Sequence, residues 1–442
     1  MLFNCSVVQL FRGSLLLPSL KFTRSGLWNN ADFLRLWAGE AVSDLGSHLG
    51  HAALMFTAVI VVHASPFEVG LLAAAGLVPN VLFGLFAGVW VDRLRKRPLM
   101  IVADLARFVL LATIPLAYAF DGLTIWQMFT VAFGTGTFTI LFDVAYQTYL
   151  PALVEKDHIL EGNSKLAASH SVSEVGGFGM SGWLVQLLNG PMAILIDAVS
   201  FLASAVAVIY IRKKEPTPRP AEEREGVRKE IVEGTRAILH HPILRATATA
   251  HAIAGFSFRM FGAVFLLYAI DELGFKPGVL GLVWAVGGIA SLVGAMYAGR
   301  AASRLGLGPA MTLGLAGMGA AMLLFPAAHD ASFIALMLMT AQQLGDGLFV
   351  VWDVNQVSLR QSLTSEHVLG RVNAGFRVAG QGAMLVGALA GGLLGEFVGL
   401  RFTLVLASCG LLAAAAVVML SPAWSAKHAP IAEMSGGEVA AG

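Results

Sequence analysis

Long apolar segments separated by short polar turns run along most of the 442-residue chain. An α-helix rises about 1.5 Å per residue, so about twenty apolar residues can cross a hydrocarbon layer of about 30 Å. The pattern therefore predicts an all-α membrane protein. Twelve membrane-spanning helices are expected at residues 33–62, 68–91, 99–120, 124–147, 167–189, 191–211, 245–270, 279–299, 309–328, 333–356, 374–398 and 400–420.

One long polar break separates the first six predicted helices from the last six. It begins with basic residues, passes through a proline-rich stretch and becomes amphipathic from about Glu222 to Leu239. About thirty residues are too few to form a core of their own, so we predict a linker with a helix that lies on the membrane surface. The expected organisation is an N-terminal extension (1–27), a six-helix half (28–211), the linker (212–242), a second six-helix half (243–421) and a C-terminal tail (422–442).

The two halves share an internal repeat at an offset of 210 residues. The sequence Phe142-Asp143-Val144 aligns with Trp352-Asp353-Val354, and Gly177 aligns with Gly387. Related halves are typical of secondary transporters, in which the substrate site lies between the halves near the middle of the bilayer.

The composition agrees with a membrane protein and narrows the possible functions. Hydrophobic residues make up 57% of the chain and charged residues 13%, whereas about 25% of the residues in a soluble globule are charged. Cys5 and Cys409 lie at opposite ends of the chain and offer no metal-ligand spacing. The sequence lacks a Gly-Lys-Ser/Thr phosphate-binding loop and a His-Glu-x-x-His motif. We expect neither an enzyme nor an ATP-driven pump, and no cofactor, metal or nucleic-acid partner.

The distribution of basic residues predicts an orientation in the membrane. With both termini in the cytoplasm, nearly all Lys and Arg residues fall in cytoplasmic loops or tails, and Lys276 and Arg401 are the clear exceptions. Short loops rich in Lys and Arg stay on the cytoplasmic side. The sequence thus predicts a multi-pass protein of the bacterial inner (plasma) membrane, which we expect to be a monomer.

The turn at residues 88–98, between the second and third predicted helices, has a distinctive order of residue types. Gly88 is followed after three residues by Asp92 and Arg93, and then by further basic residues. Gly88 lets two helix ends approach closely, and Asp92 is expected to accept hydrogen bonds from the first amides of the next helix. This order resembles the loop between helices 2 and 3 of the major facilitator superfamily, although Arg95 stands where that pattern usually has Gly. The resemblance implies twelve helices in two pseudo-symmetric halves.

Further segments narrow the resemblance to the exporter branch that contains macrolide efflux proteins and the enterobactin exporter. The similar segments are Phe33–Gly39, Asp104–Arg107, Tyr149–Pro151 and Gly370–Val372. The resemblance implies alternating-access export of amphipathic small molecules (drug-, macrolide- or siderophore-like) in antiport with protons across the lipid bilayer. Import or proton symport by the same fold, and a membrane sensor or scaffold that does not transport, are the alternatives.

The first predicted helix contains the densest set of ionisable residues. Glu40, Asp44, His48 and His51 follow at spacings of four, four and three, which places them on one helix face. An ionisable group inside a bilayer costs about 2.5–3.5 kcal/mol on insertion scales, so its presence needs a reason. We expect Asp44, near the midplane, or Glu40, one turn away, to bind and release the transported proton. The alternative is that basic partners neutralise both acids, which would then serve only helix packing. His48 and His51 are expected to be polar lining rather than metal ligands.

A second polar set lies in the C-terminal half. Arg259 is too deep in the seventh predicted helix to reach either membrane surface, and a buried guanidinium needs an acidic partner. Asp346 lies at a similar depth in the tenth helix, close to Gln342 and Gln343. We predict an ion pair between Arg259 and Asp346, with either a structural role or a role in substrate binding or proton coupling.

The remaining candidates concern gating and packing. Asp143 and Asp353 fall near the cytoplasmic ends of helices 4 and 10, and we expect them to pair with loop arginines or helix termini rather than to carry protons. The expected cytoplasmic gate comprises Gly88, Asp92, Arg93, Arg97, Asp143 and Asp353. Close helix packing is expected at Gly177, Gly182, Gly387 and Gly391. Glu174 and Asp197 are weaker candidates for function.

Overall fold

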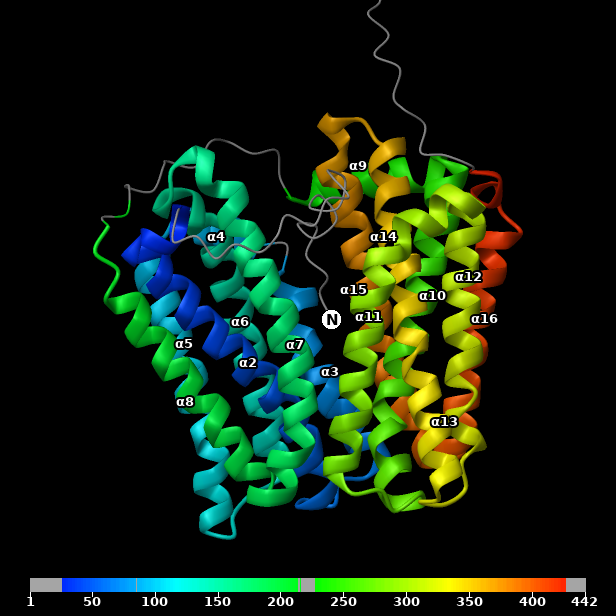
Figure 1. Ribbon diagram of the computed structural model, residues 1–442, viewed down its shortest axis with the longest axis horizontal. Helices are drawn as coiled ribbons and strands as arrows, with labels where there is room; N and C mark the ends of the chain where they lie inside the picture. The colour runs from blue at the N-terminus through cyan, green and yellow to red at the C-terminus, as the bar shows by residue number, and fades with distance from the viewer. Residues whose placement is uncertain (1–25, 85, 214, 216–226, 427–442) are drawn as a thin grey trace, which may run out of the picture.

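The computed structural model describes residues 26–84, 86–213, 215 and 227–426 (Figure 1). Residues 1–25 of the predicted N-terminal extension, the proline-rich part of the linker and most of the predicted tail lie outside these ranges.

Twelve helical spans cross the described part of the molecule side by side, which confirms the predicted all-α architecture (Figure 1). The first half contains α2 (Ala31–Ile60), α3 (Pro66–Phe83) continued by α4 (Ala87–Asp92), α5 (Lys96–Ala119), α6 (Ile125–Leu153), α7 (Ile159–Leu188) and α8 (Gly190–Ile209). The second half contains α10 (Pro242–Leu267) continued by the π-helical turn η3 (Tyr268–Glu272), α11 (Pro277–Leu305), α12 (Leu307–Met322), α13 (Phe333–Gln343) continued by α14 (Gly345–Leu363), α15 (Glu366–Phe397) and α16 (Leu400–Met419). The linker contributes α9 (Val227–His240), and the short helices η1 (Gly26–Asn29), η2 (Lys156–His158), η4 (Phe325–Ala327) and η5 (Pro422–Ser425) lie at turns.

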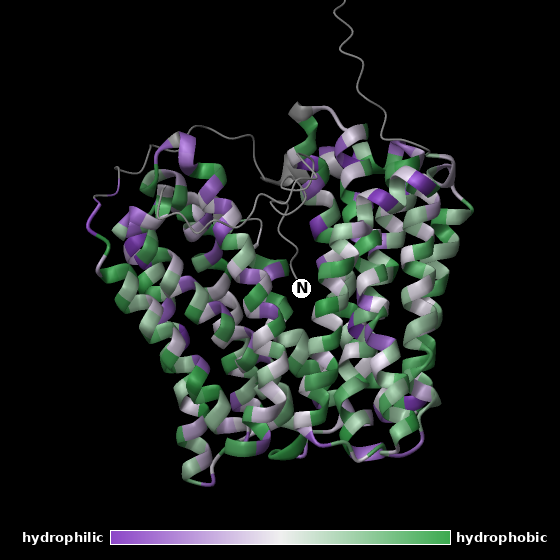
Figure 2. Cartoon of the chain, in the orientation of Figure 1, coloured by the Kyte–Doolittle hydropathy of each residue, from purple (hydrophilic) through white to green (hydrophobic). Residues whose placement is uncertain are grey.

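Ten of these spans are long and apolar enough to be recognised as membrane-crossing by length and composition among the described residues. The two others are α2 and α7, which lie among the ten and run through the same layer (Figure 1). Figure 2 shows hydrophobic residues along the length of the bundle and hydrophilic residues gathered at the end where α9 lies. These two spans are not recognised as membrane-crossing because they contain more polar residues, and their position brings polar residues into the middle of the molecule.

The internal repeat is visible in the turns that join the last two spans of each half. Asn189, between α7 and α8, has φ 71°, and Gly399, between α15 and α16, has φ 106°. The two residues are separated by the 210-residue offset of the repeat. Both tight turns use the left-handed backbone region, which Gly adopts without strain and Asn adopts more readily than most residues.

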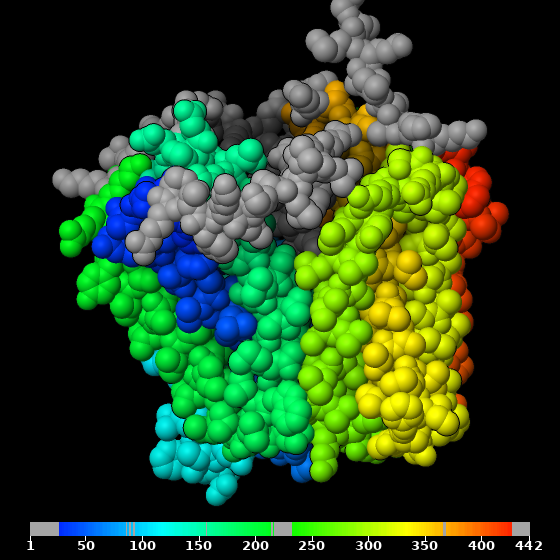
Figure 3. Space-filling view, viewed as in Figure 1, coloured from blue at the N-terminus to red at the C-terminus, as the bar shows by residue number. Residues whose placement is uncertain are grey.

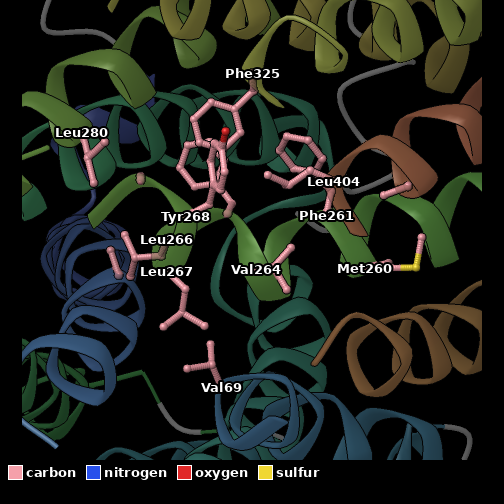
Figure 4. Packing of buried hydrophobic residues seen from close by; sticks show 14 of the residues in the cluster. Val69, Met260, Phe261, Val264, Leu266, Leu267, Tyr268, Leu280, Phe325 and Leu404 are labelled. Atoms are coloured by element: carbon pink, nitrogen blue, oxygen red, sulfur yellow. The ribbon is translucent and has the colours of Figure 1, made fainter. Parts of the chain in front are cut away.

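Aromatic side chains fill the core of the second half. The Phe265 and Phe325 rings stack with centroids 4.5 Å apart, and the Tyr268 ring meets Phe325 edge-on at 5.1 Å. The Tyr268 hydroxyl donates a hydrogen bond to the backbone oxygen of Ala328 at 2.7 Å, so its polar group is satisfied although the residue is buried. Figure 4 shows Phe261, Tyr268 and Phe325 grouped where α10 passes into η3. This packing fixes one end of the second half as a rigid unit.

The most extensive contacts between the halves join α3 with α15 and α7 with α11, and α10 makes smaller contacts with α3 and α2. Gly70 of α3 lies against Gly392 of α15, with 2.7 Å between an added Cβ on Gly70 and the Gly392 Cα. Gly182 of α7 lies against the carbonyl oxygen of Pro277, the first residue of α11. Both contacts lie toward the end of the bundle opposite the linker, which we call the far end. At the other end, the linker end, the helix ribbons of the two halves diverge (Figure 1), whereas α7 and α11 meet along their far-end portions (Figure 3).

The linker packs onto both halves at the linker end. In the first half, the Glu215 carboxylate accepts hydrogen bonds from the backbone amides of Lys96 and Arg97 at 2.6 and 3.2 Å. In the second half, Glu233 of α9 forms an ion pair with Arg371 of α15. The described part of the linker thus contains a helix where an amphipathic one was expected, and this helix packs against α15; its place on the membrane surface stays a prediction.

Candidate functional site

Acidic side chains from α2 and α6 meet in the middle of the first half. Glu40 lies within electrostatic range of Asp44, one turn along α2, and of Asp143 on α6. All three residues are partly exposed although they lie far from the helix ends. One carboxylate oxygen of Glu40 is buried and has no hydrogen-bond partner among the described residues. This acid cluster (Glu40, Asp44 and Asp143) therefore borders an accessible space inside the bundle.

Asp44 is bracketed by two histidines. Its Oδ2 lies 2.8 Å from Nδ1 of His170 on α7, and its Oδ1 lies 3.5 Å from Nε2 of His48 on α2. The two imidazole rings are 5.4 Å apart, and the His48 ring also lies 5.1 Å from the Phe178 ring. Helical spacing predicted that Asp44 and His48 share a face, but His170 comes from another helix and was missed.

Close packing of α7 on α2 holds these side chains in place. An added Cβ on Gly177 would stand 2.6 Å from the Cβ of His48, so only glycine fits at this crossing. The Ser173 hydroxyl donates to the backbone oxygen of Ala41 at 3.3 Å. The structure thus places Gly177 at a helix contact, beside the polar site itself.

A buried arginine lies behind the acid cluster. Arg107 of α5 forms an ion pair with Asp104, and its guanidinium lies over the Phe142 and Phe201 rings at 4.4 and 4.0 Å. The side chain is 3% exposed. It also interacts electrostatically with Glu40, Asp143 and Asp197. Arg107 therefore supplies positive charge to several acids inside the first half.

The segment Asp104–Arg107 carried a family resemblance in the sequence, but its electrostatic role was not predicted. An Asp and an Arg three residues apart inside an apolar helix could have indicated it. Asp197, a weaker candidate, is buried against α2, where an added Cβ on Gly50 would stand 1.9 Å from its Oδ2.

Arg259 and Asp346 face different neighbours, so the predicted ion pair is absent among the described atoms. The half-buried Arg259 has an Nε without a hydrogen-bond partner, and its guanidinium interacts with His51 of α2 across the boundary between the halves. Asp346 instead points toward α11, where its Oδ2 would lie 2.4 Å from a Cβ added to Gly287. It interacts electrostatically with Glu174 of α7 in the other half. Each residue thus has an electrostatic neighbour in the other half, but the two are not partners.

Gln342 and Gln343 lie where the tenth span is interrupted. α13 ends at Gln343 and α14 begins at Gly345. Both glutamine side chains are buried, and Gln343 Nε2 approaches the same Gly287 that faces Asp346. The predicted polar side of this span is therefore directed at α11.

Asp353 forms the counterpart of the acid cluster in the second half. It accepts a hydrogen bond from Gln356 at 3.2 Å and interacts with His251 of α10, which also faces Arg360. At the 210-residue offset of the repeat, Asp353 is equivalent to Asp143. The position equivalent to Glu40 is residue 250, next to His251. Helix residues, rather than loop arginines, thus surround both Asp143 and Asp353.

The turn between α4 and α5 is held by groups that the sequence did not identify. Glu215, from the linker, takes the capping position on α5 that was expected for Asp92, because the linker folds back over this helix start. Arg97 caps the end of α8 by donating to the backbone oxygens of Val208 and Ile209 at 3.2 and 2.6 Å. Arg93 is exposed. The surroundings of Gly88 and the side chain of Asp92 lie outside the described residues, so their gate role stays a prediction.

The remaining candidate glycines lie at helix crossings. Added Cβ atoms on Gly387 and Gly391 would stand 2.2 and 2.5 Å from the backbone oxygens of Phe256 and Met260 on α10. These two positions bring α15 onto α10 within the second half, whereas Gly182 joins the halves.

Known proteins share this arrangement of two related six-helix halves around a polar middle. The profile described as "Major Facilitator Superfamily" matches residues 41–352 and 247–435. The chain belongs to the major facilitator superfamily. It is therefore a multi-pass membrane transporter rather than an enzyme, and the resemblance stated from the loop at residues 88–98 is confirmed.

Relatives and solved structures agree with this assignment. The multidrug efflux pump Tap of Mycolicibacterium fortuitum is 27% identical over 297 residues, which cover 62% of this chain and 71% of that protein. Macrolide efflux protein A of Streptococcus pyogenes is 22% identical over 245 residues, which cover 55% of this chain and 60% of that protein. The crystal structure of the nucleoside transporter NupG has a TM-score of 0.72 at 12% identity, and covers 88% of this chain and 98% of that one. This structural likeness concerns the fold alone.

Proposed function

We propose that this transporter exports amphipathic small molecules, drug- or macrolide-like, from the cytoplasm across the bacterial inner membrane in exchange for protons. The observation that carries the proposal is the partly exposed acid cluster of α2 and α6, at mid-span between halves that touch at the far end and diverge at the linker end. Efflux relatives of two kinds, a multidrug pump and a macrolide efflux protein, support the direction and the substrate class.

The proposed orientation places the linker end in the cytoplasm. The basic residues of the α4–α5 turn and of the start of the linker lie at this end, whereas Lys276 lies at the far end. Basic residues favour the cytoplasmic side. In this conformation a molecule from the cytoplasm would enter between the diverging halves and meet Glu40 and Asp143 on one side and Arg259 on the other.

We propose Glu40 as the proton carrier, although the sequence favoured Asp44. Asp44 is already engaged by two imidazoles, whereas one oxygen of Glu40 has no hydrogen-bond partner. A carboxyl group of a partly exposed residue, with one oxygen unpartnered among the described residues and another carboxyl group nearby, is suited to bind and release a proton. Substrate arrival from the cytoplasm would displace that proton, and reprotonation from the other side would return the empty carrier. Asp346, which faces Glu174 across the boundary, is the second candidate.

The test is transport in everted membrane vesicles, whose cytoplasmic face is outward. Radiolabelled erythromycin and ethidium should accumulate inside when the vesicle interior is acidified, and accumulation should stop when the pH gradient is dissipated. Accumulation that is independent of the gradient would contradict proton antiport. Gradient-driven uptake into right-side-out vesicles instead would indicate import.

A further inference from the structure

Three metal-ligating side chains gather between α2 and α7, and the proposed proton pathway does not use them together. Asp44 and His48 come from consecutive turns of α2, and His170 comes from α7. One ligand atom of each residue lies within 4.8 Å of the others. We propose that Asp44, His48 and His170 form a binding site for a divalent first-row transition-metal ion such as Zn²⁺ or Co²⁺.

The distances fit coordination after a small adjustment. Ligand atoms about 2.1 Å from a tetrahedral ion are separated by about 3.4 Å. Asp44 Oδ1 lies 3.5 Å from His48 Nε2, Asp44 Oδ2 lies 2.8 Å from His170 Nδ1, and one ligand atom of each residue lies within 4.8 Å of the others. The His170 side chain is 48% exposed, so it has room to move outward by the fraction of an ångström that an ion requires.

The donor set identifies the class of ion. Two imidazole nitrogens and one carboxylate oxygen suit Zn²⁺, Co²⁺, Fe²⁺ or Ni²⁺, whereas Mg²⁺ and Ca²⁺ prefer oxygen ligands alone. Nε2 of His48 is buried and has no hydrogen-bond partner among the described residues, so an acceptor nitrogen is available for a metal. Three protein ligands leave further coordination positions open toward the accessible side, where water or a chelating molecule can bind.

The surroundings favour a cation and hold the ligands in place. Glu174, one turn beyond His170 on α7, and Asp143 on α6 both interact electrostatically with His170. The contact of Gly177 with His48 fixes the separation of the two helices at the site. Negative charge near the ion strengthens binding of a cation, and close packing around His48 restricts the orientation of that ligand.

This proposal departs from the expectation that His48 is only polar lining. That expectation considered α2 alone, in which Asp44, His48 and His51 continue along one face. His170 is 126 residues from Asp44 in the sequence and completes the set only in the folded chain. His51 is not part of the cluster and lies instead near Arg259.

Titration of the purified full-length chain with Zn²⁺ by calorimetry, after removal of any polyhistidine tag, tests the site. Co²⁺ titration followed by visible absorption gives the coordination geometry. We expect one ion per chain, and at least a tenfold loss of affinity in each of Asp44→Asn, His48→Gln and His170→Gln. His51→Gln, on the same helix, and His329→Gln, in a far-end loop, are matched controls that should keep the wild-type affinity. The measurement requires no transport, so its result is independent of the export proposal.

Two outcomes would overturn the proposal. Zn²⁺ affinity that is unchanged in His170→Gln would show that the cluster is a hydrogen-bonded group without a metal. An equal loss in His51→Gln would place the ion elsewhere. Because a variant can also lose affinity through misfolding, each must match the wild type in gel-filtration profile, and addition of Zn²⁺ should raise the unfolding temperature of the wild type and both controls but not of the three ligand variants.

Discussion

Gly182 of α7 touches Pro277 of α11 across the boundary between the halves, so closely that an added Cβ would stand 2.0 Å from the Pro277 carbonyl oxygen. The atom on the other side is backbone, which cannot rotate away. Even one methyl group at Gly182 must therefore separate the two helices at the far end.

We expect Gly182→Ala to shift the protein toward a conformation that is open at the far end. Cysteine probes placed at the far end of α7, in a background with Cys5→Ser and Cys409→Ser, should then react faster with a membrane-impermeant maleimide. Gly299→Ala is the matched control on α11, because nothing lies within 4 Å of an added Cβ there. Equal labelling rates in the Gly182 variant and the control would show that this contact does not hold the far end closed.

Glu40→Gln should separate substrate binding from pumping. The amide keeps the shape and hydrogen-bonding capacity of the side chain but cannot carry a proton. Binding of a fluorescent substrate should be retained, whereas gradient-driven accumulation in everted vesicles should fall to the background level. Asp44→Asn should affect accumulation less. Glu155→Gln, an exposed acid in the loop before α7, is the control. Full accumulation by the Glu40 variant would move the proton site to Asp346.

Arg107→Ala should be strongly destabilising. Removal of the guanidinium leaves several buried or half-buried acids, among them Asp104 and Asp197, without their cation, and breaking such a pair costs about 3–5 kcal/mol. The unfolding temperature of the purified protein should drop clearly. Arg93→Ala removes an exposed arginine and should leave that temperature nearly unchanged. A small effect of Arg107→Ala would mean that the surrounding acids are neutral in the folded protein.

Arg259→Ala and Asp346→Ala should have additive effects on stability. The two side chains have different neighbours, and independent sites add to within about 0.5 kcal/mol. Chemical or thermal unfolding of the two single variants and the double variant measures the coupling. A double variant that is more stable than the sum predicts would show that the pair forms in another conformation of the transport cycle.

The sequence predicted the helical spans because hydrophobic length and helical rise are local properties. It predicted the shared face of Glu40, Asp44 and His48 for the same reason. Partners on other helices, such as His170 for Asp44 and Arg107 for Glu40, depend on how helices pack, which periodicity within one helix does not contain.

The predicted ion pair of Arg259 with Asp346 failed for an identifiable physical reason. It was inferred from depth alone, but depth does not determine rotation about the helix axis. The interruption at Leu344 between α13 and α14 makes extrapolation of that rotation along the span unreliable. Glu215 was missed as an acceptor for the first amides of α5 because it is distant in sequence and reaches them from the linker.

The repeat does not carry the same charges in both halves. Glu40 of α2 lies near Asp143, whereas the second half has His251 near Asp353, and Arg259 of α10 lies near His51 of α2. In the proposed export cycle, a cargo with one basic group would place that group toward Glu40 rather than toward Arg259. Regioisomers of equal hydrophobicity that differ only in the position of an amine would then be carried at different rates.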